Sequence, residues 1–259
     1  MVEHPIDNKR DYDQYYSKVS WDKRDSLASR YILYLSRLLL EKIDCAEIKK
    51  VVDVGCGDGA KTFNLLQLFK NANILGVDFS APGIEHANRL YKKLSSRIRF
   101  EVYEAENIAY LNNDVDLVTA FYVLEHIKDW KSVVDSWFLS GVRYVLLFVP
   151  SGRMYRYDKI EHYQHFPKGT LEKYFSSCGY DCINSFYWGF PFYHPITKIA
   201  LDIGMNSARE TTSQKPTFFL NLIYDVLYFL YTRCTSRRIG GDFIGLFQRE
   251  NDINYRSNL

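Results

Sequence analysis

The sequence has almost no excess of charge, no paired cysteine motif and no leading apolar segment. Lys and Arg total 33 against 31 Asp and Glu, so the formal net charge is only +2. That balance argues against a nucleic-acid partner, because nucleic-acid binders usually carry a strongly basic patch. The five cysteines include no CxxC pair, and the opening residues MVEHPIDNKRDYDQYY contain no signal-like apolar run. We therefore expect a cytoplasmic protein with reduced thiols and no disulfide framework.

The sequence also lacks an apolar run long enough to cross a membrane. The longest candidate, residues 218–231, reads FFLNLIYDVLYFLY, with twelve apolar residues of fourteen. A spanning helix needs about 20 residues, so this segment is too short. Five basic and two acidic residues lie between Met205 and Arg238, a weak positive bias. We expect the segment to pack into the core, with contact at a membrane surface as the alternative.

Alternating strand and helix patterns dominate the first 150 residues. Five apolar, strand-like runs are separated by helical patterns, at residues 49–57, 73–80, 97–105, 115–123 and 142–150. Unbroken apolar strands separated by helices indicate a parallel sheet covered on both faces. Two further strand patterns, at 181–189 and 243–250, complete seven strands. The sequence thus predicts an α/β fold with a doubly wound, mostly parallel seven-stranded sheet.

The first strand ends in a glycine turn that points to a nucleoside ligand. Asp53 is followed by Gly55, Gly57 and Gly59, a GxGxG spacing and not the GxGxxG of dinucleotide sites. A carboxylate beside the turn would repel a pyrophosphate, which favours a ligand with positive charge. Asp78 ends the next strand, where a carboxylate can accept hydrogen bonds from both ribose hydroxyls. These features predict a cationic nucleoside; the alternative is a structural turn with two solvated carboxylates.

At these residues the chain resembles the class I S-adenosylmethionine-dependent methyltransferases. The likeness rests on VVDVGCGDGA, GVDFS and VDLVTAFYVLEHIKD, and it covers roughly residues 50–189. It is nearest to the small-molecule branch that includes ubiquinone and menaquinone methyltransferases. The resemblance implies a Rossmann-like fold, S-adenosylmethionine as cofactor and S-adenosylhomocysteine as product.

The resemblance also assigns cofactor contacts to individual residues. The family usually has Asp-Ala where this chain has Glu104-Ala105, whose carboxylate and backbone would contact the adenine. The methionine end would be held by Asp53 and by the turn at Gly55, Cys56 and Gly57, with the ring of Phe121 beneath it. Asp78 would bind the ribose, and Phe79 would lie against the adenine.

Two histidines follow the fifth strand on the side where the methyl acceptor would bind. A neutral imidazole at His162 or His165 can take a proton from an attacking hydroxyl. The alternative is that both rings brace loops, since His-x-x-His-Phe recurs in relatives with different substrates. We expect no metal site at Glu161, His162 and His165, because a solvated charged cluster is the commoner arrangement.

The chain is expected to form a single domain over residues 1–259. Relatives often fold the N-terminal segment over the cofactor, so 1–49 is predicted to be a helical lid, followed by a cofactor-binding core at 50–189. Residues 190–239 form an aromatic-rich insertion between strands six and seven, and 240–259 the last strand and tail. The candidate acceptor contacts are Tyr16, Tyr122, Phe192 and Tyr193.

Three functions are consistent with this pattern. The first is methyl transfer by in-line displacement to a hydroxyl or amine of a small organic acceptor, such as a secondary metabolite or a glycan or lipid intermediate. The second is a lipid or quinone methyltransferase held at a membrane surface by residues 218–231. The third is a nucleoside-binding protein without catalysis.

Overall fold

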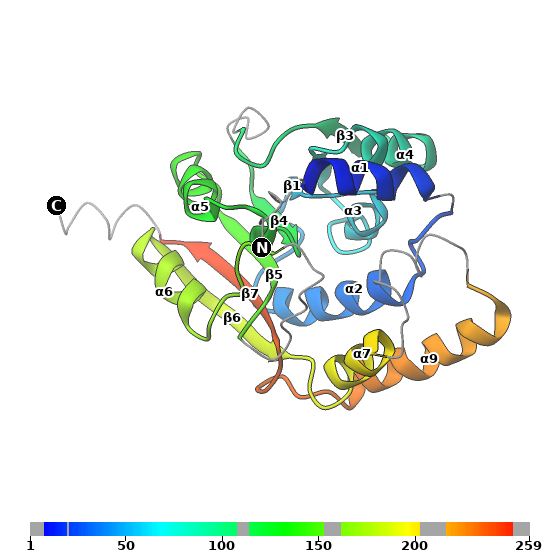
Figure 1. Cartoon of the computed structure of the whole chain (residues 1–259). Helices are drawn as coiled ribbons and strands as arrows, with labels where there is room; N and C mark the ends of the chain where they lie inside the picture. Colours follow the sequence, from blue (N-terminus) through cyan, green and yellow to red (C-terminus); the bar gives the residue numbers. More distant parts are fainter. Residues whose placement is uncertain (1–7, 20, 108–113, 153–161, 203–215, 251–259) are drawn as a thin grey trace, which may run out of the picture.

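Seven strands form one sheet in the computed structural model, which describes residues 8–19, 21–107, 114–152, 162–202 and 216–250. The strand order is β3-β2-β1-β4-β5-β7-β6 (Figure 1). The strands are β1 (Lys50–Val54), β2 (Asn73–Asp78), β3 (Ile98–Val102), β4 (Leu117–Phe121), β5 (Tyr144–Pro150), β6 (Tyr180–Trp188) and β7 (Asp242–Arg249). Only β7 runs antiparallel to its two neighbours. The predicted doubly wound, mostly parallel sheet is confirmed.

Helices cover both faces of the sheet because the strand side chains alternate between two cores. In β5, Leu146 and Phe148 belong to one core, while Val145 and Leu147 belong to the other. Helices α2, α3 and α4 pack on the first core, and α5 and α6 on the second. The helices are α1 (Asn8–Lys18), α2 (Leu27–Leu40), α3 (Ala60–Leu65), α4 (Ala81–Tyr91), α5 (Trp130–Leu139), α6 (Thr170–Ser177), α7 (Tyr193–Asp202) and α9 (Phe218–Arg233), with a 3-10 turn η2 at Leu124–His126.

The order in which successive strands are added to the sheet reverses between β1 and β4. β1 pairs in parallel with β2 on one side and with β4 on the other, so the loops after β1 and β4 open away from each other. In such a sheet, ligands bind outside the carboxyl ends of the strands at this point. The glycine turn after β1 and the η2 turn after β4 both lie there, and they frame the candidate site.

Helix α9 lies on the surface, which corrects the expectation that residues 218–231 pack into the core. One side of α9 packs on α2, where Arg30 pairs with Asp225 at 2.6 Å and Tyr34 meets Tyr228 edge to face. Only Tyr231 and Thr232 of α9 are fully buried. The cause is its near-continuous apolar sequence, which supplies more apolar side chains than one packed face can cover. No helix among the described residues is both long and apolar enough to cross a bilayer.

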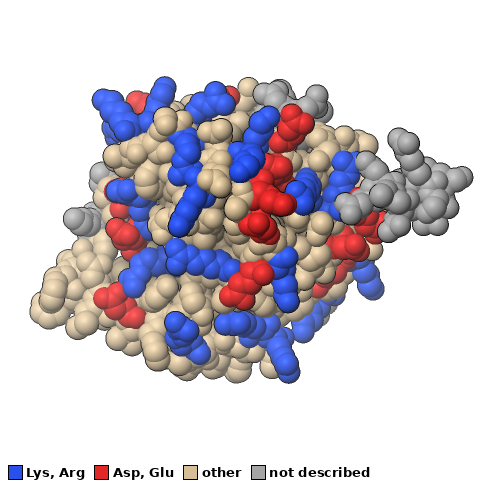
Figure 2. Space-filling model, turned by 180° about the vertical axis from the view of Figure 1, so that it is seen from behind, with Lys and Arg blue, Asp and Glu red and all other residues tan. Residues whose placement is uncertain are grey.

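Charged side chains are mixed in sign over the surface. On the face shown in Figure 2, Lys and Arg lie interspersed with Asp and Glu and are not gathered into one basic area. The lobe at the lower left of that view, where α9 projects, is built mainly of uncharged side chains. On this face of the molecule, most charged side chains therefore lie outside the lobe.

Candidate functional site

The glycine turn after β1 lies directly against the carboxylate that ends β2. The N–H of Gly57 donates to Asp78 Oδ2 at 2.8 Å, and the N–H of Ser80 donates to Oδ1 at 2.8 Å. Gly55, Gly57 and Gly59 all have positive φ, at 67°, 56° and 77°. A Cβ at Gly57 would collide with the hydroxyl of Tyr16. The turn therefore needs glycine both for its backbone conformation and for the close approach of a neighbour.

Asp78 presents a negative charge at this edge of the sheet. Its side chain is only 7% exposed, and burial raises its pKa to about 6 even though two backbone N–H groups act in the opposite direction. The carboxyl is therefore ionised at neutral pH, although it is nearly enclosed. Such a group favours a ligand that carries hydroxyl donors or positive charge.

Asp53, in contrast, lies inside the protein. It is fully buried, and its two oxygens accept hydrogen bonds from Thr62 Oγ1 at 2.5 Å and Thr119 Oγ1 at 2.6 Å. Burial raises the pKa of Asp53 to about 6, and both threonine bonds lower it. Since Thr62 belongs to α3 and Thr119 to β4, the Asp53 carboxylate ties three elements beneath the turn. Its direct contacts are with the protein interior.

Two other predicted cofactor residues also point into the core. The thiol of Cys56 is buried near Gly76, and burial raises its pKa well above the usual value. Phe121 is buried and meets Phe148 edge to face, with ring centroids 5.2 Å apart. Both side chains lie in the core beneath the turn, while the backbone of Cys56 is part of the turn.

Helix α1 lies across the predicted cofactor residues. Lys9 Nζ pairs with Glu104 Oε1 at 3.0 Å, and the ring of Tyr12 meets Phe79 edge to face at 5.8 Å. Asp13, next to Tyr12, accepts a hydrogen bond from Ser80 Oγ at 2.5 Å. Tyr12 and Asp13 lie three and four residues after Lys9, so one face of α1 makes all of the contacts. In Figure 1, α1 lies over the same part of the molecule as β3 and α4.

Tyr16, on the same face of α1, is placed on the cofactor side and not beside the insertion. Its ring stands over Gly57 and Gly83, next to the turn, and Asp78 contributes to raising its pKa. Ala105, the other predicted adenine contact, is partly buried and packs against the core under α5 and α6. The structure thus brings Gly57, Asp78 and Phe79 together against the face of α1 that carries Tyr16.

We expect Gly57→Ala to abolish most cofactor affinity, whereas Gly169→Ala leaves it unchanged. Both glycines have positive φ, so each alanine costs about 1–2 kcal/mol of backbone strain. A Cβ at Gly57 would enter the space above the turn that the Tyr16 hydroxyl occupies here and that a bound cofactor would fill, but a Cβ at Gly169 meets nothing within 4 Å. Calorimetric titration with S-adenosylhomocysteine should therefore separate the two variants by at least about tenfold in Kd. Equal affinities would show that the close approach at Gly57 does not matter for binding.

The acceptor side is built around Tyr122 and a carboxylate that the sequence did not single out. Tyr122 follows β4 with a φ of 62°, an uncommon conformation for an aromatic residue, and donates its hydroxyl to Asp242 Oδ2 at 2.7 Å. Asp242 begins β7 opposite Pro150, which places it at the carboxyl end of β5. Burial raises the pKa of Asp242 to about 7. The antiparallel pairing of β7 brings this residue to the site.

The insertion reaches the same region through α7. Tyr193 accepts a hydrogen bond from Tyr31 at 3.2 Å, and Asp242 contributes to raising its pKa. Phe192 is partly buried against the core on the α2 side. Among the predicted acceptor residues, the structure therefore groups Tyr122 and Tyr193 around Asp242, while Tyr16 lies apart on α1.

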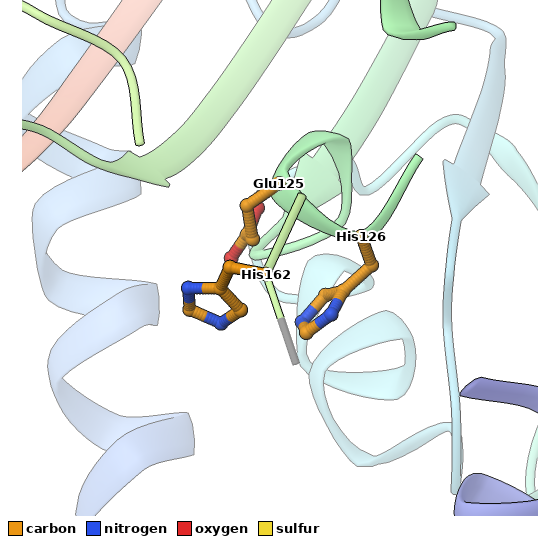
Figure 3. A group of neighbouring side chains, drawn as sticks. All are labelled: Glu125, His126 and His162. Atoms are coloured by element: carbon orange, nitrogen blue, oxygen red, sulfur yellow. The ribbon is translucent and has the colours of Figure 1, made fainter. Parts of the chain in front are cut away.

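A second group that the sequence partly missed follows β4. Glu125, His126 and His162 lie side by side with the potential ligand atoms of their side chains within 4.8 Å of one another (Figure 3). Glu125 is 1% exposed, and burial raises its pKa to about 8. Its Oε2 has no hydrogen-bond partner among the described residues. The only sequence signal for Glu125 was its place in the LEHIKD segment that carries the family resemblance.

Hydrogen bonds fix the protonation pattern of the two predicted histidines. His165 Nδ1 lies 3.3 Å from the carbonyl oxygen of Gly152, so this nitrogen carries a proton. Burial lowers the pKa of His165, which is therefore neutral near pH 7, and its Nε2 accepts from His162 Nδ1 at 2.8 Å. The lone pair of His162 then resides on Nε2. This is the arrangement that a proton acceptor requires.

Glu125, His126 and His162 together have the donor set of a metal site. Two imidazoles and a carboxylate are ligands that zinc and similar ions accept. Glu161, which the sequence analysis considered with His162 and His165, lies outside the described residues. The expected absence of a metal stays a prediction, to be checked by metal analysis of the purified protein.

Comparison with known proteins finds similarity to methyltransferases over part of the chain. Residues 51–138 match the family model described as a methyltransferase domain. A ubiquinone biosynthesis O-methyltransferase from Cupriavidus pinatubonensis is 34% identical over 89 residues, which cover 34% of this chain and 35% of that protein. A phosphoethanolamine N-methyltransferase from Arabidopsis thaliana is 28% identical over 106 residues, covering 41% of this chain and 21% of that protein. The matched region thus spans about a third or less of these relatives.

Solved structures share the fold. A protein provisionally named as a sarcosine dimethylglycine methyltransferase, from Galdieria sulphuraria, superposes with a TM-score of 0.60 over 84% of this chain and 83% of that one. The two sequences are only 14% identical, so this likeness concerns the fold. Residues 51–138 thus match a methyltransferase domain, and the sheet around them has the fold of a solved protein named as a methyltransferase.

Proposed function

We propose that the protein transfers a methyl group from S-adenosylmethionine to an oxygen or nitrogen of a small organic acceptor. The observation that carries this proposal is the nearly buried, ionised Asp78 beside the Gly55–Gly59 turn, under one face of α1. A carboxylate at this position suits ribose hydroxyls and the positive charge of a sulfonium nucleoside. The GxGxG spacing of the turn also differs from the GxGxxG of nicotinamide dinucleotide sites.

The residues present fit that cofactor. Gly57 supplies a surface without a Cβ, Asp78 supplies hydroxyl-binding oxygens, and the ring of Phe79 is partly exposed beside it. Glu104 would reach the adenine only after releasing Lys9. Tyr16 stands over the turn in this structure, so cofactor binding requires α1 to shift. When bound, the cofactor supplies a methyl group on positively charged sulfur, which a lone pair on oxygen or nitrogen can attack.

His162 is proposed to accept the proton of a hydroxyl acceptor. Its Nε2 carries the lone pair, while its Nδ1–H is held by His165, which is itself held by the Gly152 carbonyl. After proton transfer, His162 is a cation beside the Glu125 carboxyl. His162 is thus the proposed general base, and His165 is a positioning residue.

Binding and turnover are tested separately. Calorimetry should show S-adenosylmethionine and S-adenosylhomocysteine binding without detectable NAD binding. Incubating acceptor pools with a donor labelled in its methyl group, followed by mass spectrometry, should then reveal a labelled product. Preferential binding of NAD would overturn the cofactor assignment. Tight cofactor binding with no product from any pool would instead favour the non-catalytic nucleoside-binding function.

We expect Asp78→Ala to weaken S-adenosylhomocysteine binding by about tenfold or more. The variant loses the ribose-binding oxygens and leaves buried donors without a partner, which costs on the order of 1–3 kcal/mol. Asp44→Ala is a matched control, because Asp44 also accepts a bond from the backbone N–H two residues on, at 2.8 Å, but precedes β1 at the other edge. Calorimetry on folded proteins measures both. Unchanged affinity in Asp78→Ala would remove the main support for the proposal.

A further inference from the structure

The exposed face of α9 carries a continuous row of large apolar side chains. Phe218 and Phe219 are 81% and 76% exposed, and four other side chains of the row are more than half exposed. The six residues are Phe218, Phe219, Leu222, Ile223, Val226 and Phe229. Their spacing places them on one side of the helix, away from the side that packs on α2. Single exposed apolar residues are ordinary, but a row of this size marks an interaction surface.

Basic side chains lie at the C-terminal end of this apolar face and form its rim. Arg233 ends α9, and Arg237 and Arg238 follow it, all exposed, with the guanidinium groups of the first two over aromatic rings of α2 and β6. Lys198 on α7 is exposed beside Ile199, which extends the apolar surface. Asp225 is the one acidic residue between Pro216 and Gly241, and Arg30 pairs with it at 2.6 Å. The rim is therefore positive.

We infer that α9 and its basic rim bind the surface of an anionic lipid bilayer. A helix with one apolar face and flanking cations lies in the plane of the interface, with the apolar face among the acyl chains and the cations at lipid phosphates. A second copy of the chain is the alternative occupant, and it would not account for the cations at the rim. The sixteen-residue α9 lies along the membrane and does not cross it.

The opposite, buried side of α9 contacts the acceptor side of the site. Tyr231 of α9 meets Tyr193 of α7 edge to face, with ring centroids 5.2 Å apart. Tyr193 in turn lies in the field of Asp242, which binds the hydroxyl of Tyr122 at the carboxyl end of β4. Docking through α9 therefore brings this edge of the sheet close to the lipid. The acceptor is then a lipid-soluble or lipid-attached molecule, a conclusion that rests on the proposed function.

Vesicle flotation with the full chain tests the docking. We expect binding to vesicles of phosphatidylcholine with 30% phosphatidylglycerol, weak binding to phosphatidylcholine alone, and loss of binding as salt rises. The double variant Phe218→Ser/Phe219→Ser should bind at least about tenfold more weakly. Arg237→Glu/Arg238→Glu should do the same, because each basic side chain contributes about fivefold in affinity at an anionic surface. Leu139→Ser is the control, since Leu139 is 82% exposed on α5 and should not matter.

The alternative occupant and the acceptor have their own readouts. A dimer in light scattering that Phe218→Ser/Phe219→Ser dissociates, with no vesicle binding by the wild type, would overturn the inference in favour of self-association. Labelled methyl recovered in the organic extract of vesicles containing natural lipids supports a lipid-borne acceptor, and label confined to the aqueous phase contradicts it. Titration of each variant with S-adenosylhomocysteine is done in parallel. Failure of docking with cofactor binding intact is thereby distinguished from failure of the proposed function.

Discussion

Replacing His162 with alanine should lower kcat for a hydroxyl acceptor by about a hundredfold and leave the Kd for S-adenosylhomocysteine unchanged. The variant removes the Nε2 lone pair that accepts the proton, and general-base catalysis typically contributes about 10²–10⁴-fold. The measurement is the initial rate of formation of the labelled product identified by mass spectrometry. Added imidazole should restore part of the rate, because a small base can occupy the space of the deleted ring.

His165→Ala provides the comparison that separates proton transfer from loop bracing. His165 accepts a hydrogen bond from the Nδ1–H of His162 and so positions that ring. Removal of the His165 side chain should therefore lower kcat by a smaller factor, about tenfold, and imidazole should not restore the rate. If both histidines merely brace the loop, the two variants should lose stability together, and neither should respond to imidazole. Unchanged kcat in His162→Ala would exclude it as the base.

Glu125→Gln should make the protein more resistant to alkaline pH. The folded-state pKa of Glu125 is about 8, above its ordinary value of 4.5, because burial disfavours the charged form. The folded state therefore holds a proton that the unfolded chain releases, and the resulting stability is complete below pH 4.5 and is lost as pH rises through 8. Glutamine has nearly the shape of the protonated acid and stays neutral. Between pH 5 and 9, the unfolding free energy of the variant relative to the wild type should rise by roughly 2–4 kcal/mol.

Urea unfolding at pH 5, 7 and 9 measures this difference. Glu47→Gln is the control, because the Glu47 side chain is exposed and forms only a surface pair with Arg143 at 3.4 Å. Its difference from the wild type should stay within about 0.5 kcal/mol at all three pH values. A Glu125→Gln curve parallel to the wild type would show that Glu125 is already ionised at neutral pH in the fold. The folded-state pKa of Asp242 is about 7, so its ionisation should also lower the stability of the wild type as pH rises.

Local sequence patterns were sufficient to predict the sheet and its cofactor edge. Unbroken apolar runs such as Val145–Val149 can only be buried on both faces, and this requirement leads directly to a covered parallel sheet. The turn at Gly55–Gly59 and the acid at Asp78 each end a strand, so their meeting follows from parallel pairing of β1 and β2. Both predictions depend on neighbouring strands and need no knowledge of distant contacts.

The acceptor side was less predictable because distant segments build it. Asp242 has no motif around it, and only the antiparallel insertion of β7 beside β5 moves it to the carboxyl edge. The side chain of Asp53 was expected at the cofactor, but Thr62 and Thr119 occupy both of its oxygens. The composition of residues 218–231 gave no means of telling a buried helix from an interfacial one. That distinction depends on how much of the helix α2 can cover.

The position of β7 sets the order in which the molecule can be completed. β6 is made before β7, yet its only partner in the sheet is β7, which also separates it from β5. A nascent chain that has emerged only as far as β6 can thus hold the five parallel strands but has nowhere to hydrogen-bond the sixth. The aspartate beside Tyr122 arrives with the same final strand. During synthesis, the edge of the sheet that carries the glycine turn and Asp78 can therefore form before Asp242 reaches Tyr122.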